Sequence, residues 1–126
     1  MSGRDEEHEG RKHARASGVL LLAGSLATVA LMTQHPTVSS HELGSVLEQI
    51  AAQARANRFV HGAVIASSAI ITIGLTGLAG RLGWRSLRVR AGALAWLLGL
   101  LSFAGAALVN GFVLTSLAEE IGRAHV

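Results

Sequence analysis

Three long stretches of the chain contain no acidic or basic side chain, and they constrain its fold more than any other feature. They cover residues 17–34, 59–80 and 91–118. A helix needs about 20 predominantly apolar residues to cross about 30 Å of hydrocarbon. Because lipid offers the backbone no hydrogen-bond partner, runs of this length are expected to be helical. The sequence therefore predicts an all-α integral membrane protein with three transmembrane helices, at about 17–34, 59–80 and 91–117.

The composition agrees with this class and excludes others. The chain is 50% hydrophobic with a mean hydropathy of +0.44, which is more apolar than a soluble domain of this length usually is. It has no Cys, so a disulfide framework and a thiolate metal site are excluded. The pI of 11.1 does not indicate nucleic-acid binding, because the Arg residues flank apolar runs and do not alternate with aromatic side chains. The abundance of Arg, Ala and Gly is typical of a GC-rich bacterial genome, so the lipid bilayer we expect is the bacterial plasma (inner) membrane.

The distribution of positive charge predicts an orientation. Eight basic residues lie before the first span or between the second and third, and two lie between the first and second: Arg4, Arg11, Lys12, Arg15, Arg81, Arg85, Arg88 and Arg90, against Arg55 and Arg58. Since cytoplasmic loops carry the excess of Lys and Arg, the N-terminus and residues 81–90 are expected in the cytoplasm, and residues 35–57 outside. Trp84 and Trp96, near the inner ends of the spans, fit an interfacial aromatic belt.

The N-terminal segment is polar and has its own interpretation. Residues 1–16 are charged and lack apolar periodicity, so we expect a disordered cytoplasmic tail. The first span has an alternative interpretation as a cleaved secretory signal, with an apolar core at 18–29 and small residues at Thr28-Val29-Ala30. An uncleaved anchor is favoured, because four acidic residues make the polar segment unlike a signal peptide: Asp5, Glu6, Glu7 and Glu9.

The connection between the first two spans predicts an outer amphipathic helix at about 40–56. Ser39 and Glu42 have the spacing of a capping box, in which Ser39 accepts from the backbone at position 42 and Glu42 reaches back. Apolar residues then recur at helical spacing: Leu43, Val46, Leu47, Ile50, Ala51 and Ala54. We expect this helix to lie on the outer membrane surface or over the end of the bundle, and to be able to continue through Arg58 into the second span.

Small residues form ladders at helical spacing inside two of the spans. The second span carries Ser68, Thr72, Thr76 and Gly80, and the third carries an interrupted series of Ala95, Gly99, Ala107 and Gly111. Such faces let helix backbones approach closely within a membrane. We interpret them as packing seams within the chain, in a homo-oligomer or against other membrane subunits.

The candidate chemistry lies toward the outer ends of the spans, at His35, His41, His61 and Asn110. Neutral imidazoles suit Zn, Cu or haem iron, and polar groups within spans are functional candidates because they are costly to leave unpaired. The alternative is interfacial exposure of the His side chains and one interhelical hydrogen bond from Asn110. We favour this alternative, with no metal or other cofactor, because no pair shows the i, i+4 spacing of a helical metal site.

The sequence carries no catalytic motif. The three spans contain no carboxylate, so we expect no acid/base pair or proton relay in the membrane, and no enzyme. The preferred interpretation is a structural or accessory membrane subunit. The alternative is an outward-facing metal- or haem-binding redox bundle that uses His35, His41, His61 and Asn110.

The C-terminal residues have a separate interpretation. Residues 121–126, IGRAHV, match a translation of a widely used sequencing-library adapter whose next triplet is a stop codon, so we interpret residues 120–126 as an artefact. The transmembrane domain is then 17–119, and Ser116 and Glu119 repeat the capping-box spacing of Ser39 and Glu42. We therefore expect a truncated four-helix bundle, with a fourth span encoded beyond Glu119.

Overall fold

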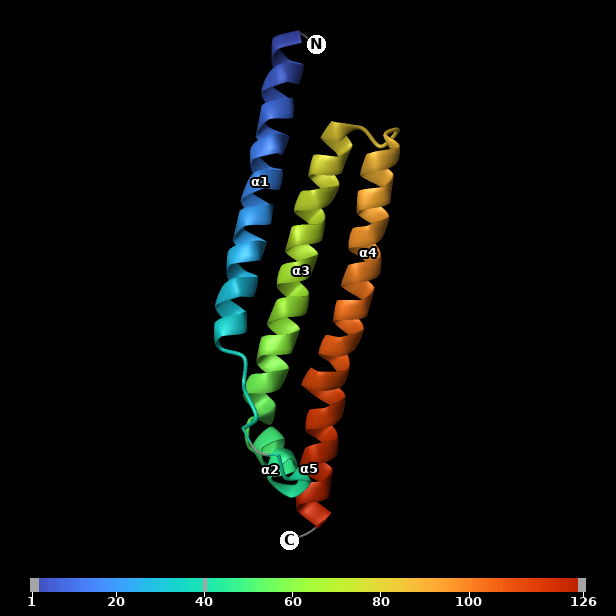
Figure 1. Ribbon diagram of the computed structural model, residues 1–126. Helices are drawn as coiled ribbons and strands as arrows, with labels where there is room; N and C mark the ends of the chain where they lie inside the picture. Colours follow the sequence, from blue (N-terminus) through green and yellow to red (C-terminus); the bar gives the residue numbers. More distant parts are fainter. Residues whose placement is uncertain (1–2, 40, 125–126) are drawn as a thin grey trace. The chain divides into compact units, whose positions relative to one another are not determined.

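The computed structural model describes residues 3–39 and 41–124, and it describes side chains from residue 10 onward. The elements are α1 (Gly3–Thr33), α2 (Leu43–Ala52), α3 (Ala54–Leu82), α4 (Leu87–Leu108), a π-helical turn η1 (Val109–Val113) and α5 (Leu114–Ala124), shown in chain order in Figure 1. Helix accounts for 89% of the described residues, which contain no strand. The all-α prediction is confirmed.

Three of the described helical stretches are long and apolar enough to cross a membrane. They are Gly10–Thr33, Ala54–Leu82 and the continuous run Leu87–Ala124, with mean hydropathies of 1.8, 1.8 and 2.0 in their most apolar parts. In each of these parts, at most 22% of the residues are buried within the chain. The prediction of three such helices is confirmed by length and composition. Their surfaces remain apolar, as expected for helices that face lipid.

The chain divides into two compact units, each of which draws on several helices. Unit 1 comprises Met1–Thr28 with Ser67–Leu100, and unit 2 comprises Val29–Ala66 with Leu101–Val126. All the contacts described below lie within one unit or the other.

In unit 1, α1 packs closely on α3. A Cβ on Gly24 would lie 2.6 Å from Ile71 Cγ1 and 3.0 Å from the Ser67 carbonyl oxygen. Reciprocally, a Cβ on Gly74 would lie 2.8 Å from Leu21 Cγ and 3.0 Å from a backbone carbonyl oxygen of α1. The two backbones therefore meet where each helix lacks a side chain, which is how helices associate without a hydrophobic driving force between them.

The α1–α3 contact is closed by a polar pair. The hydroxyl groups of Thr28 and Ser67 lie 2.8 Å apart and share a hydrogen bond. Thr28 Oγ1 also lies 2.9 Å from the Gly24 carbonyl oxygen, so the polar atoms of this seam bond to one another or to the helix backbone. We call the set Ser17, Leu21, Gly24 and Thr28 with Ser67, Ile71, Gly74 and Gly77 the α1–α3 seam.

Unit 1 also contains the turn between α3 and α4. Gly83 has φ +90°, a conformation that glycine adopts without a Cβ penalty, and it ends α3. Its amide donates to the Ala79 carbonyl oxygen at 3.0 Å. On the other side of the turn, Trp96 Nε1 donates to Thr72 Oγ1 at 3.0 Å. The α3 ladder predicted from Ser68, Thr72, Thr76 and Gly80 thus contributes Thr72 to the contact with α4, whereas α1 packs on the neighbouring face of α3.

The N-terminal segment is helical where the structure describes it. The helix α1 begins at Gly3, so the backbone of residues 3–16 continues the helix of the first apolar stretch. Once a helix is nucleated, each added residue contributes one hydrogen bond, and Glu, Arg, Lys and Ala favour the helix. The disordered tail expected at 1–16 stays a prediction, and the backbone that the structure describes at residues 3–16 is helical.

In unit 2, the amphipathic helix is shorter than predicted and is not capped by Ser39. The N-cap of α2 is Glu42, which is extended and makes no side-chain capping bond. The Ser39 amide donates to Gln49 Oε1 at 3.1 Å, so Ser39 contacts a side chain of α2. Helix α2 packs against α5, and α3 starts directly after Gln53.

Candidate functional site

The candidate site lies in unit 2, around the π-helical turn η1. A π-turn displaces backbone carbonyls from their usual amide partners, and such turns are frequent at functional sites. Two side chains donate to backbone carbonyls of η1. Asn57 Nδ2 donates to the Asn110 carbonyl oxygen at 3.0 Å. Thr115, which is fully buried, lies with its Oγ1 at 2.8 Å from the Gly111 carbonyl oxygen and 3.0 Å from that of Phe112, a shared bond of the kind common at helix irregularities.

His61 packs directly against the backbone of η1. Its side chain is 9% exposed. A Cβ on Gly111 would lie 2.5 Å from His61 Cβ and 2.7 Å from His61 Cγ. His61 therefore occupies the space that a side chain at position 111 would need, and only glycine allows this approach.

The hydrogen bond made by His61 defines the role of each ring nitrogen. His61 Nδ1 lies 2.9 Å from the carbonyl oxygen of Asn57. A carbonyl oxygen can only accept, so Nδ1 carries the proton and donates. Nε2 is then the ring nitrogen that remains for a further partner. Metal-binding His residues commonly show this same arrangement, in which a backbone carbonyl orients the ring.

The structure brings together some of the residues predicted from the sequence. The rings of His35 and His61 are in edge-to-face contact, with centroids 5.0 Å apart. Asn110 contributes its backbone carbonyl to the bond with Asn57, while its side chain is exposed. His41 is exposed and belongs to no group with the others. Among the described residues, no cluster of three or more His, Asp or Glu is placed to hold a metal ion.

A charged pair adjoins the π-turn and was not anticipated. Arg58 Nη2 lies 2.6 Å from Glu119 Oε2, and both side chains are about one-third exposed, at 35% and 36%. The same nitrogen donates to Ser116 Oγ at 3.3 Å. The pair ties the start of α3 to α5 and neutralises a cation and a carboxylate at the ends of two apolar helices, where isolated charges are costly.

Sequence reasoning missed three contributors to this site, namely Asn57, Thr115 and the Arg58–Glu119 pair. The Arg58–Glu119 pair could have been expected from the distance of each residue from the turn along the chain. In a helical hairpin that turns near Gly83, positions equally far before and after the turn lie at similar heights, which puts Arg58 within about two turns of Glu119. No local sequence pattern predicts η1, because the formation of a π-turn depends on the residues that pack against it.

The fold and the site together define a class of protein, an all-helical chain with three membrane-span-like helices and a polar junction around η1. No protein-family model, no curated protein and no solved structure matches this chain. The function of the chain is therefore inferred from the chemistry of its own residues.

Proposed function

We propose that the chain is an integral protein of the bacterial inner membrane that serves as a structural or accessory subunit and packs against further membrane helices, without catalysing a reaction. One observation carries this proposal. On the part of α4 that belongs to unit 1, Ala95 and Gly99 are exposed, and a Cβ on Gly99 would meet nothing within 4 Å. Large side chains such as Leu94 and Leu98 are exposed beside them, at 59% and 58%.

The contrast within α4 supports an assembly role. Small residues that pack inside the chain, such as Ala107, are buried, whereas Ala95 and Gly99 form a shallow strip between leucines that no part of unit 1 covers. Another helix fills such a strip better than mobile lipid tails do, because small residues let two backbones come close. The occupant we propose is a second copy of this chain or a helix of another membrane subunit.

The proposed orientation follows the charge bias. We place the N-terminus and the α3–α4 turn in the cytoplasm, because that turn carries Arg81, Arg85, Arg88 and Arg90 within ten residues. The segment that contains α2 then lies outside, together with the junction of His61 and η1.

Single cysteines test both parts of the proposal, because the natural chain contains none. In intact cells, a membrane-impermeant thiol reagent is expected to label Gln53→Cys and to leave Arg85→Cys unlabelled. In oxidised membranes, Gly99→Cys is expected to form a cross-linked dimer, or with a bifunctional reagent an adduct to another membrane protein. Leu97→Cys, on a different face of α4 and also exposed (48%), is the matched control and should form much less product.

Two outcomes of this experiment count against the proposal. Labelling of Arg85→Cys from outside would reverse the orientation. Equal cross-linking at positions 97 and 99, or none at either, would show that the small-residue strip is not an assembly surface.

A second candidate function is an outward-facing metal- or haem-binding redox bundle. The contact between the His35 and His61 rings and the availability of His61 Nε2 favour it, since imidazole suits Cu, Zn and haem iron. Two imidazoles do not complete a coordination shell, so further ligands would have to come from another chain, from water or from the porphyrin.

Metal analysis and absorption spectroscopy of the purified protein separate the two candidates. Under the subunit proposal we expect no Soret band and no stoichiometric Cu or Zn, and His61→Ala should change neither the metal content nor the spectrum. His41→Ala is the control, because His41 is exposed and its ring is not part of the contact between His35 and His61. A bound metal or haem that is lost with His61→Ala and kept with His41→Ala would establish the redox bundle instead.

A further inference from the structure

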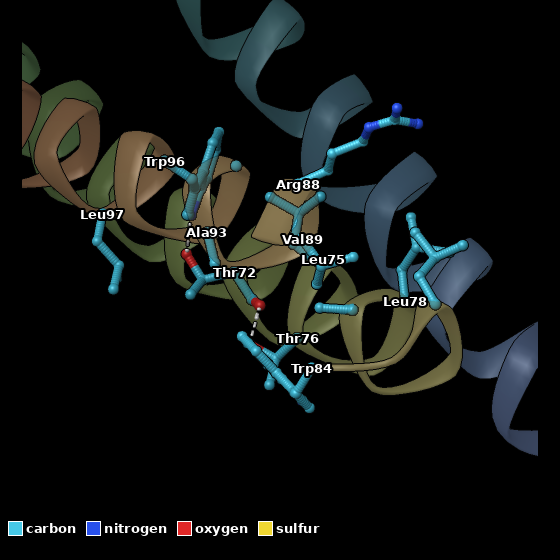
Figure 2. Close-up of a pocket in the computed structure, with 13 residues that line it drawn as sticks. Thr72, Leu75, Thr76, Leu78, Trp84, Arg88, Val89, Ala93, Trp96 and Leu97 are labelled. Atoms are coloured by element: carbon cyan, nitrogen blue, oxygen red, sulfur yellow. Dashed lines mark hydrogen bonds between the residues drawn. The ribbon is translucent and has the colours of Figure 1, made fainter. Parts of the chain in front are cut away.

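A cavity of about 370 Å³ lies within unit 1, where the end of α3, the Gly83 turn and the start of α4 meet. Figure 2 shows the residues that line it, on both helices and on the turn between them. Most of its wall is apolar or aromatic, including Leu75, Leu78, Leu82, Val89, Trp84 and Trp96. Its volume is within the range of small-molecule sites, about 300–1,000 Å³.

The hydroxyl groups in the wall are already used. Thr72 Oγ1 donates to the Ser68 carbonyl oxygen at 2.8 Å and accepts from Trp96 Nε1 at 3.0 Å. Thr76 Oγ1 donates to the Thr72 carbonyl oxygen at 2.8 Å, and Figure 2 marks this bond and the Trp96 bond with dashed lines. An occupant of the interior therefore finds little to hydrogen-bond and is best matched by an apolar group.

The edge of the cavity has the opposite character. Arg88 lines it and is exposed, and in Figure 2 its guanidinium lies at the margin of the lining group. Within the described part of the chain, neither the Arg88 guanidinium nor the Trp84 indole N–H has a hydrogen-bonding partner. The sequence from residue 49 to residue 118 contains no Asp or Glu, while residues 81–90 carry four Arg. These donors therefore favour an anion from outside the hairpin.

We propose that this cavity is a binding site for an anionic phospholipid, with an acyl chain between Trp84 and Trp96 and the headgroup phosphate on Arg88. An apolar interior with cationic donors at its edge matches an amphiphile with a negative headgroup. Basic pockets between transmembrane helices on the cytoplasmic side bind such headgroups, and Trp is enriched at that depth. The site requires the membrane insertion proposed above, but it does not depend on the role as a subunit.

Quenching by brominated acyl chains tests the site, because the chain has two Trp residues and both line the cavity. The full chain is reconstituted in nanodiscs that contain brominated phosphatidylglycerol or brominated phosphatidylcholine at equal mole fraction. We expect stronger quenching by phosphatidylglycerol, competition by the unbrominated form of that lipid, and no competition by inorganic phosphate. Trp84→Phe leaves Trp96 as the single reporter of the interior.

Matched arginine variants separate a site from general charge attraction. Arg88→Gln is expected to lower the preference for phosphatidylglycerol over phosphatidylcholine about fivefold, the effect of one cation near a phosphate. Arg90→Gln removes the same charge from a residue that does not line the cavity, and should lower the preference twofold or less. Circular dichroism should be unchanged in both, since neither side chain makes a described contact.

Each other outcome overturns a defined part of the argument. Equal quenching by both lipids, or equal losses for Arg88→Gln and Arg90→Gln, would exclude the phospholipid site while leaving the proposed function intact. Competition by inorganic phosphate as strong as that by phosphatidylglycerol would show an anion site with no role for the acyl chain. If neither lipid quenches either Trp, the helices are not inserted, and the proposed function fails as well.

Discussion

Gly24→Leu is expected to force α1 away from α3 and to lower the free energy of unfolding by about 1–3 kcal/mol, the usual cost of overpacking a close contact. Even the first carbon of the new side chain would lie 3.0 Å from the Ser67 carbonyl oxygen and 3.2 Å from the Ile71 amide nitrogen. These are backbone atoms, so the neighbouring helix itself has to move and a rotamer change cannot relieve the clash.

Gly18→Leu is the matched control for this change. Gly18 lies in the same helix, is exposed, and would meet nothing within 4 Å of an added Cβ. Replacing glycine by leucine in an exposed helical position is expected to be neutral or to stabilise by up to about 1 kcal/mol. The free energy of unfolding of both variants is measured by titrating the protein in mild detergent with SDS, with circular dichroism as the signal. If the two destabilise equally, the α1–α3 seam is not a tight contact.

Gly111→Leu is expected to disrupt the junction of His61 with the π-turn, again at a cost of about 1–3 kcal/mol. The new Cβ would lie 2.5 Å from His61 Cβ, and a Cβ is held by the backbone of α3, so rotating the imidazole does not remove the conflict. When α3 moves, the Asn57 side chain also leaves the Asn110 carbonyl oxygen, so this hydrogen bond is lost as well.

Gly105→Leu is the control on α4, because Gly105 is exposed and an added Cβ would meet nothing within 4 Å. It should retain stability within about 1 kcal/mol of the natural chain. The same SDS titration applies, and the imidazole NMR signals of His35 and His61 give a local readout, because their rings are in contact. Unchanged imidazole signals in Gly111→Leu would contradict the close approach described here.

The packing at Gly24 and Gly111 was predicted only in part from the pattern of small residues in the sequence. Some of the small residues on the second and third spans pack within the chain, such as Thr72 and Gly111, whereas packing of the exposed ones against a partner stays a prediction. In α3 the contact with α1 uses Ser67, Ile71 and Gly74, whereas the predicted ladder lies one residue further along, on the face that carries Thr72. Small residues occupy more than one face of α3, and spacing alone does not say which face a neighbour covers.

The small-residue series predicted on the third span also contains positions that face different surroundings. Gly111 and Ala107 are buried, while Ala95 and Gly99 of the same predicted series are exposed. A straight helix keeps residues four apart on a slowly rotating line, so a ladder interrupted for eight residues does not stay on one face. The series therefore combined positions with different environments.

The candidate site was predicted in part. His61 was identified as a functional candidate because it is a polar residue inside an apolar stretch, and the structure buries it against Gly111. Its contact with His35 joins residues 26 positions apart, and His35 lies in the connection after α1, so no helical periodicity encodes that pairing. Asn57 was missed because its acceptor, the Asn110 carbonyl oxygen, lies 53 residues away in the chain. Thr115 was missed because a threonine that bonds to the carbonyl four residues before it leaves no distinctive pattern in the sequence.

Amino-acid order alone was sufficient for the helical class, the three membrane-length stretches and the presence of a short connection between the second and third of them. These properties follow from local physics, since an uncharged apolar run must satisfy its own backbone hydrogen bonds and charged residues mark where such a run ends. The α1–α3 seam, the π-turn, the start of α2 and the Arg58–Glu119 pair depended on the three-dimensional structure. Each of these features joins residues that are distant in the chain or adapts a helix to its neighbour. The free energy of such a contact depends on both segments together, so neither segment predicts it alone.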